Sequence, residues 1–219
     1  MVMDGRSSHL RHLLDTYEAK KTEIKERLRE FEEMGKEGEK EIFAELCFCI
    51  LTSQSKAKVC DSAIKKLVKN NVLFEGSQEG IRQFLDGVRF PNNKARYIAE
   101  ARDFLSMEGR IKIKENIDSF GDVQELREWL ATNIKGMGYK EASHFLRNIG
   151  RGEDLAILDR HILRNLESLG IVGGYKGGLT KRRYLEYESK MRQFARRVNI
   201  SLAELDLLFW SEETGEIFK

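Results

Sequence analysis

The stretch "IKGMGYKEASHFLRNIG" (residues 134–150) decides the fold that we expect for this chain. Residues 122–133 before it and residues 140–149 within it carry apolar side chains at helical spacing, so only "NIKGMGY" connects two helices. A connection this short forces a tight turn, and Gly136 and Gly138 supply the freedom that positive φ angles need. The stretch therefore predicts a helix-hairpin-helix.

The two hairpin glycines also create a candidate phosphate site. Without side chains at these positions, the backbone N–H groups that open the second helix face outward, and the positive end of the helix dipole lies beside them. Such a site would hold a DNA backbone without reading its sequence, which makes Gly136 and Gly138 candidate DNA-binding residues. The alternative is an ordinary αα-hairpin whose glycines only permit the turn.

The rest of the chain is also predicted to be helical. Leu10, Leu13, Leu14 and Tyr17 start a long charged helix, which Gly35 and Gly38 are expected to end. Residues 40–52 are apolar around most of the circumference, as in a helix at the centre of a bundle. Period-two alternation occurs only in "IKIKENI" (111–117), so the fold class is all-α. Further helices are predicted at 56–69, 77–86, 93–107, 160–169, 181–198 and 202–212.

Composition excludes several classes of protein. The 219 residues can form a core without metals or disulfides, and 38 basic against 36 acidic residues leave a net charge of +2. With so small a net charge, a DNA-binding surface would have to be a local stripe of basic residues. Runs such as 181–187 could form such a stripe, but they also suit the solvated faces of helices. No apolar run approaches the ~20 residues of a membrane span. Three cysteines without a CxxC pair indicate reduced thiols and no zinc, so we expect a cytoplasmic, nucleoid-associated monomer.

Two residues near the hairpin suit catalysis. Lys140 opens the second helix, where the dipole disfavours an ammonium group and favours the neutral amine that a nucleophile needs. Asp159 follows nineteen residues later in "AILDRHILRNL", directly before another predicted helix. The alternative roles are a solvated lysine and a helix N-cap, and a capping aspartate can still serve a cleft that its helix borders.

These motifs resemble a known group of enzymes. "IKGMGYKEA" followed by "ILDRHILR" resembles the helix-hairpin-helix, Gly/Pro-rich, Asp superfamily of DNA base-excision glycosylases. In the members that also cleave the strand, a lysine and an aspartate at the positions of Lys140 and Asp159 form the active site. "LTSQSKA" (51–57) and "RFPNNKARYI" (89–98) extend the likeness, which covers about residues 40–170.

The chain departs from the superfamily pattern in two ways. Ile134-Lys135 stands where Leu-Pro usually precedes the first hairpin glycine. The four clustered cysteines that follow the aspartate in the endonuclease III branch are missing, so no iron–sulfur cluster is implied.

The C-terminal "LLFWSEETGEIFK" resembles the second family of 8-oxoguanine DNA glycosylase/lyases, from archaea and thermophilic bacteria. In that family a terminal lysine, here Lys219, takes part in recognising the base. Guanine N7 accepts a hydrogen bond whereas N7 of 8-oxoguanine donates one, so an acceptor such as the Lys219 carboxylate would favour the lesion. Apolar Ile217 and Phe218 indicate that the tail docks; a frayed end is the alternative.

The resemblance implies an architecture and further site residues. We expect a six-helix barrel-like subdomain at 40–150, with the hairpin at 122–149, and a second helical subdomain from 1–39 and 151–219. The damaged base would flip into a cleft between them, Gln54 or Phe90 would fill the gap in the stack, and Trp210 would sandwich the base. No cofactor is required, but hairpin carbonyls would hold a monovalent cation, those of Thr132, Ile134 and Met137.

The implied function is a bifunctional glycosylase/AP lyase that excises 8-oxoguanine from double-stranded DNA and nicks the strand by β-elimination through a Schiff base on Lys140. One alternative is the same chemistry on another oxidised base. A second is a non-catalytic helix-hairpin-helix module that binds only the DNA backbone. A helical scaffold without a DNA role is the third.

Overall fold

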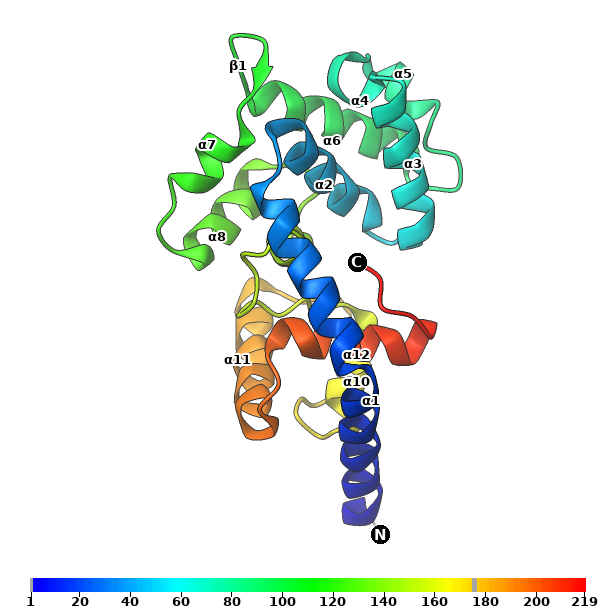
Figure 1. The fold of residues 1–219 in the computed structure, drawn as a ribbon, viewed down its shortest axis with the longest axis vertical. Helices are drawn as coiled ribbons and strands as arrows, with labels where there is room; N and C mark the ends of the chain where they lie inside the picture. The colour runs from blue at the N-terminus through cyan, green and yellow to red at the C-terminus, as the bar shows by residue number, and fades with distance from the viewer. Residues whose placement is uncertain (1, 175–176) are drawn as a thin grey trace. The chain divides into compact units, whose positions relative to one another are not determined.

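A computed structural model describes residues 2–174 and 177–219 of the chain. The chain forms two compact units, a central unit of Glu33–Arg151 and a terminal unit of Met1–Glu32 with Gly152–Lys219 (Figure 1). Helices make up nearly all of the described secondary structure, which confirms the predicted all-α fold class. The exception is a small antiparallel pair of strands, β1 (Ser106–Met107) and β2 (Arg110–Ile111).

The central unit is built around α2 (Glu39–Thr52), whose residues 45–52 are all buried. This confirms the prediction of a central helix, because a helix without a polar face must be covered on every side. The helices that pack on it include α3 (Ala57–Lys69), α6 (Pro91–Phe104), α7 (Ile113–Asp118) and α9 (Tyr139–Asn148). Figure 1 shows α2 beside α3 and α6.

Shorter helices complete the central unit, α4 (Val72–Glu75), α5 (Gln78–Arg82), α7 (Ile113–Asp118) and α8 (Val123–Asn133). The helix predicted at 77–86 is wrong in length, because a turn follows α5 and Gly87 adopts a φ of +78°. The stretch 111–117, the one place with period-two alternation, is a strand only at residue 111. Ile113 and Ile117, four residues apart, are both buried on one face of α7.

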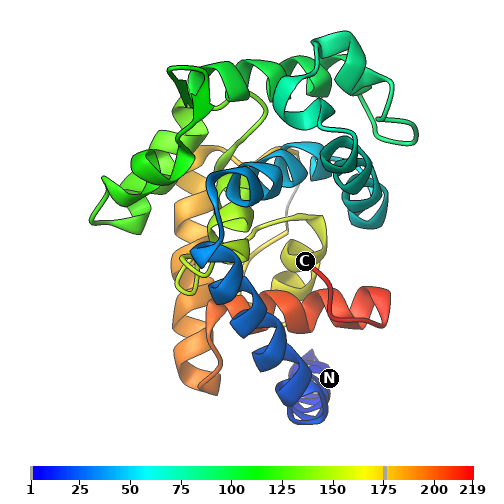
Figure 2. The same cartoon turned by 45° about the horizontal axis from the view of Figure 1, so that its top comes forward.

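The terminal unit contains most of α1 (Val2–Lys36), together with α10 (Arg160–Ser168), α11 (Lys181–Val198) and α12 (Leu202–Thr214). In Figure 2 the orange α11 leads into the red α12. The Tyr17 hydroxyl of α1 donates to Glu204 Oε1 at 2.9 Å, and Ser201 N donates to Glu204 Oε2 at 2.8 Å. Glu204 therefore closes a capping box with Ser201 and also joins α12 to α1.

The glycine-rich segment 170–180 is a loop in its described residues, and α11 begins after it at Lys181. Residues 175 and 176 lie outside the described part of the chain. Gly35, expected to end the first helix, instead lies inside α1, and Gly38 is the N-cap of α2. A Cβ added at Gly35 would lie 2.3 Å from the backbone oxygen of Ile149. Only glycine therefore lets α1 approach the end of α9 this closely.

We predict that Gly35→Ala destabilises the protein by more than ~1 kcal/mol, because the added methyl group meets backbone that cannot move aside. Helix propensity alone would give the opposite sign, since alanine is favoured over glycine in a helix by ~1 kcal/mol. Chemical unfolding measures the difference. Gly80→Ala in α5 is the matched control: the atoms nearest to its Cβ would lie 3.6 Å away, so it should be neutral or stabilising. Equal effects of the two variants would refute the close-approach argument.

Candidate active site and DNA-binding hairpin

The hairpin between α8 and α9 is anchored by its apolar residues. Ile134 and Met137 are 2% and 5% exposed, so the turn is fixed to the core. Gly136 adopts a φ of +85°, and a Cβ there would lie 2.6 Å from Cδ2 of Tyr97. Gly138 has a φ of −99°, so the prediction that positive φ requires glycine holds at Gly136 and is wrong at Gly138.

A buried arginine locks the two helices of the hairpin together. Arg127 of α8 is 1% exposed, and its guanidinium carbon lies 4.8 Å from the centre of the Tyr139 ring. Its Nη1 donates to Ser143 Oγ of α9 at 3.3 Å, and the Tyr139 hydroxyl donates to Glu128. The sequence analysis missed Arg127; the signal was a charged residue beside Leu126 and Leu130 on the apolar face.

Lys140 lies in the first turn of α9, as predicted, and its side chain is 23% exposed. Its Nζ is 3.4 Å from Glu141 Oε1, while Glu141 Oε2 accepts from Gly138 N at 3.2 Å. Glu141 thus already engages one amide of the proposed phosphate site. The N–H groups of Tyr139 and Lys140 also belong to the first turn, where no helical carbonyl is available to them. These amides are the ones that an incoming phosphate can reach.

A second lysine lies near the first. Lys94 of α6 is 4% exposed and donates to Leu51 O, Ser53 O and Ser55 Oγ at 2.6, 2.6 and 2.9 Å. The pKa of Lys94 is lowered to about 8, chiefly by burial; Lys140 and Arg89 contribute to the lowering, whereas Cys60 and Glu141 oppose it. A lowered pKa alone would select Lys94 as the nucleophile. Its ammonium group is engaged by three protein acceptors, however, whereas the Lys140 side chain is 23% exposed.

Gln54 and Phe90 occupy the tips of two turns. Gln54 lies between α2 and α3, and Phe90 is the N-cap of α6, one residue before Pro91. Each has a φ of 55°, a left-handed conformation that is rare for side chains of their size. Both are exposed, Phe90 by 52%. Strained and exposed residues of this kind cluster at functional sites.

Asp159 is the N-cap of α10, which confirms that part of the sequence interpretation. Its Oδ1 accepts from the backbone N–H groups of His161 and Ile162, both at 2.8 Å. No described donor bonds to Oδ2. One oxygen of the carboxylate therefore caps the helix, and the other is available for chemistry.

The segment that leads to Asp159 is held rigidly by α11. Residues 155–158 are all buried. The Tyr184 hydroxyl donates to Ala156 O at 2.6 Å and accepts from Leu158 N at 3.2 Å, while Glu188 Oε2 accepts from Ala156 N at 3.0 Å. Asp159 is thus placed by an irregular segment whose buried backbone groups bond to the side chains of Tyr184 and Glu188.

Trp210 and the C-terminal tail belong to the same unit as Asp159. The Trp210 ring lies with its centre 4.8 Å from that of His161, and His161 Nδ1 is 3.1 Å from Glu213 Oε2. Ile217 is 5% exposed, so the tail is docked, and Lys219 is half-buried. The sequence analysis did not single out His161, although it stands two residues after Asp159.

The predicted site residues divide between the two units. Gln54, Phe90, the hairpin and Lys140 lie in the central unit, whereas Asp159, Trp210 and Lys219 lie in the terminal unit. Within the terminal unit, His161 links Asp159 to Trp210: its N–H donates to Asp159 and its ring lies against the Trp210 ring. That the two groups face one cleft stays a prediction.

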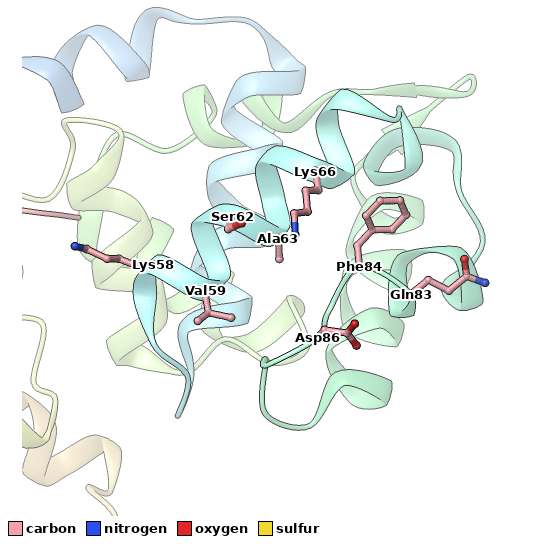
Figure 3. Close-up of a pocket in the computed structure, with 8 residues that line it drawn as sticks. All are labelled: Lys58, Val59, Ser62, Ala63, Lys66, Gln83, Phe84 and Asp86. Atoms are coloured by element: carbon pink, nitrogen blue, oxygen red, sulfur yellow. The ribbon is translucent and has the colours of Figure 1, made fainter.

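A pocket of about 380 Å³ in the central unit is a separate feature (Figure 3). Side chains of α3 line one side, and Gln83, Phe84 and Asp86 line the other. It includes none of the predicted site residues. In the part of the chain that the structure describes, no helix is long and apolar enough to cross a membrane.

Comparisons with known proteins agree on one family. The sequence profile of the family described as 8-oxoguanine DNA glycosylase matches residues 24–200. An 8-oxoguanine DNA glycosylase/AP lyase of Fusobacterium nucleatum is 45% identical over 215 residues, which cover 98% of this chain and 99% of that protein.

Two solved structures are similar over nearly their whole length. One is the Methanocaldococcus jannaschii 8-oxoguanine glycosylase/lyase in complex with DNA containing 8-oxoguanine, with a TM-score of 0.82, 37% identity, and coverage of 95% of this chain and 100% of that one. The other is the 8-oxoguanine DNA glycosylase of Thermotoga maritima, with a TM-score of 0.83, 36% identity, and coverage of 98% and 100%.

We predict that Gly136→Ala weakens both the hairpin and its grip on duplex DNA. A left-handed alanine costs ~1–2 kcal/mol, and its methyl group displaces the Tyr97 ring. Gly138→Ala is the control: its Cβ would meet only the flexible Glu141 carboxylate, at 3.4 Å, so the cost should stay below ~1 kcal/mol. Thermal unfolding and titration of an undamaged duplex at low salt measure the two effects. Equal binding by both variants would argue against a role for the turn geometry.

Proposed function

Because the chain belongs to the 8-oxoguanine DNA glycosylase family and is an 8-oxoguanine DNA glycosylase/AP lyase, we propose that Lys140 and Asp159 carry out its chemistry. The observation that carries this assignment is the position of Lys140: a reachable amine in the first turn of α9, beside the hairpin. The substrate is double-stranded DNA that contains 8-oxoguanine. All the proposed groups come from one chain, so we propose that it acts as a monomer on nucleoid DNA.

The hairpin would bind the DNA backbone on one side of the lesion. Gly136 lets the turn lie flat against Tyr97, and Gly138 leaves the start of α9 without a side chain. The first-turn amides and the helix dipole then face a phosphate. The flipped nucleotide would leave a gap in the stack, which Gln54 or Phe90 fills from its exposed turn.

The neutral Lys140 amine attacks the sugar C1′, and the bond from C1′ to the base breaks as the new C–N bond forms. Ring opening then gives a Schiff base between Lys140 and the sugar. The Schiff base acidifies the C2′ proton, so loss of that proton expels the 3′ phosphate and nicks the strand.

Asp159 would stabilise the positive charge that develops on the sugar while the base departs. Its Oδ2 is the oxygen suited to this role, because Oδ1 is engaged by two N–H groups of α10. The same two bonds fix the orientation of the carboxylate, so its charge is positioned before the reaction begins. We also propose that Trp210 stacks on the base and that Lys219 takes part in its recognition, supported by the burial of Ile217 beside the tail.

The hairpin offers backbone carbonyls to a monovalent cation, which we propose as a structural ion. Among the described residues, no backbone N–H donates to the carbonyl oxygens of Thr132 and Met137, whereas that of Ile134 accepts from Met137 N at 3.2 Å. Two free carbonyls in one tight turn suit a hard cation. When bound, the ion would reduce repulsion between these carbonyls and a phosphate. No cofactor is required by the proposed chemistry.

We predict that borohydride traps a covalent adduct between the protein and a duplex with one 8-oxoguanine, and that Lys140→Gln abolishes it. Reduction converts the Schiff base to a stable amine, so the adduct reports the nucleophile directly. The matched control is Lys135→Gln, another hairpin lysine, which is 67% exposed and pairs with Glu100 at 3.1 Å; it should trap normally. An adduct in Lys140→Gln would show that another amine attacks. Duplex binding without any adduct would favour the non-catalytic module.

Asp159→Asn should slow base release by about 100-fold or more and leave stability within ~0.5 kcal/mol, since asparagine also caps helices. Asp159→Ala should lose the same activity and in addition ~1 kcal/mol of stability, because both N–H groups of α10 lose their acceptor. Single-turnover base release and chemical unfolding separate the two roles. If Asp159→Asn keeps its activity, the aspartate is only a helix cap.

A further inference from the structure

We propose that Lys94 is a positioning residue, which holds the turns that carry Gln54 and Phe90 in the shape that meets the DNA stack. The proposal rests on the proposed function, in which one of these two side chains fills the gap left by the flipped base. Lys94 itself would not touch the DNA, because it is 4% exposed and its ammonium group is directed at protein oxygens.

The ammonium group of Lys94 bonds on both sides of Gln54. It donates to Ser53 O and Ser55 Oγ, the neighbours of Gln54 in the chain, and to Leu51 O at the end of α2. The last turn of α2 carries no basic residue of its own. Lys94 therefore supplies, from α6, the cation that the negative end of this helix favours.

The backbone of Lys94 belongs to the second turn. Its N–H donates to Phe90 O at 3.1 Å, in the first hydrogen bond of α6. Arg89 N donates to Ser55 Oγ at 3.0 Å, and the same hydroxyl accepts from Lys94 Nζ at 2.9 Å. One hydroxyl group thus joins the two turns, and one lysine holds both.

The conformation of the two turns explains why such a support is needed. Gln54 and Phe90 both have a φ of 55°, in the left-handed region of backbone conformation that residues other than glycine rarely adopt. Residues in this region stay there only when the surroundings over-determine them. The bonds to Leu51, Ser53 and Ser55 provide that constraint around Gln54, and Pro91 with the start of α6 provides it after Phe90.

If Lys94 supports the residues that fill the stack, its loss should slow base release more than strand cleavage at an abasic site. Release of 8-oxoguanine requires a paired base to leave the stack, and a side chain must take its place. Cleavage at a preformed abasic site requires no base to be extruded. A residue that acts through Lys140 would instead impair both steps, because both pass through the same amine.

The test is Lys94→Met, which keeps the length of the side chain and removes its donors. In single-turnover assays, base release from an 8-oxoguanine duplex should fall about 10- to 100-fold. Strand cleavage at a preformed abasic site should fall less than about threefold. Gln54→Ala and Phe90→Ala are measured in the same assays, and at least one of them should show the same split. A double variant that combines Lys94→Met with that substitution should release the base little more slowly than the single variant. The residue that Lys94 positions is already missing in it, so the loss of Lys94 has no further effect.

Two further variants keep the test decisive. Lys66→Met, at an exposed lysine of α3, controls for the loss of a positive charge in the same unit and should leave both rates unchanged. Ser55→Ala removes the hydroxyl that joins the two turns, so it should show a weaker form of the same split and serves if Lys94→Met does not fold. Circular dichroism confirms that each variant is folded.

Two outcomes would overturn the positioning role while leaving the proposed function intact. One is an equal loss of base release and abasic-site cleavage in folded Lys94→Met. The other is full additivity of Lys94→Met with both Gln54→Ala and Phe90→Ala. Failure of the proposed function has a different signature: the unaltered protein would release no 8-oxoguanine in these assays, which would overturn both.

Discussion

The burial of α2 over residues 45–52 is the constraint on which the rest of the central unit depends. This part of the helix needs neighbours on every side, and two of these neighbours, α6 and α9, begin at predicted site residues. Two buried polar contacts fix their register on α2: Asn148 of α9 donates to Glu45 at 2.6 Å, and Lys94 of α6 donates to the carbonyl of Leu51. Because an unpaired polar group in such a core is costly, these contacts leave the helices few alternative arrangements. The positions of Lys140 and of the exposed turns thus follow from how one apolar helix is covered.

The two units supply different parts of the proposed chemistry. The central unit provides backbone amides, stack-filling side chains and the nucleophile, and all of them lie at helix starts or in the turns before them. The terminal unit provides the carboxylate and the groups assigned to the base. There Asp159 is placed by Tyr184 and Glu188, two side chains of α11 that form hydrogen bonds with the backbone of the residues before it. The hydrogen bonds that hold Lys94 and those that hold Asp159 each lie within one unit.

Sequence reasoning reached the fold class, the central helix, the hairpin and the cap at Asp159, because each depends on local spacing or on a single residue type. It failed where tertiary contacts decide. The alternating stretch 111–117 gave no helical signal, yet packing places Ile113 and Ile117 on one face of α7. Gly35 was expected to end the first helix, although it serves a close contact with Ile149. Lys94 and Arg127 escaped notice because a charged residue on an apolar face has meaning only when its acceptors, distant in sequence, are known. In both cases the signal was present as a break in the apolar pattern.

The two oxygens of the Asp159 carboxylate have an evolutionary consequence. One secures the helix and the other is assigned to the reaction, so the two duties reside in different atoms of one side chain. Exchanging a single oxygen for an amide nitrogen would remove the charge and preserve the fold. Selection for stability alone therefore cannot maintain this enzyme as an enzyme. A lineage released from the need to repair DNA could retain a well-folded descendant whose chemistry had been lost without any structural trace.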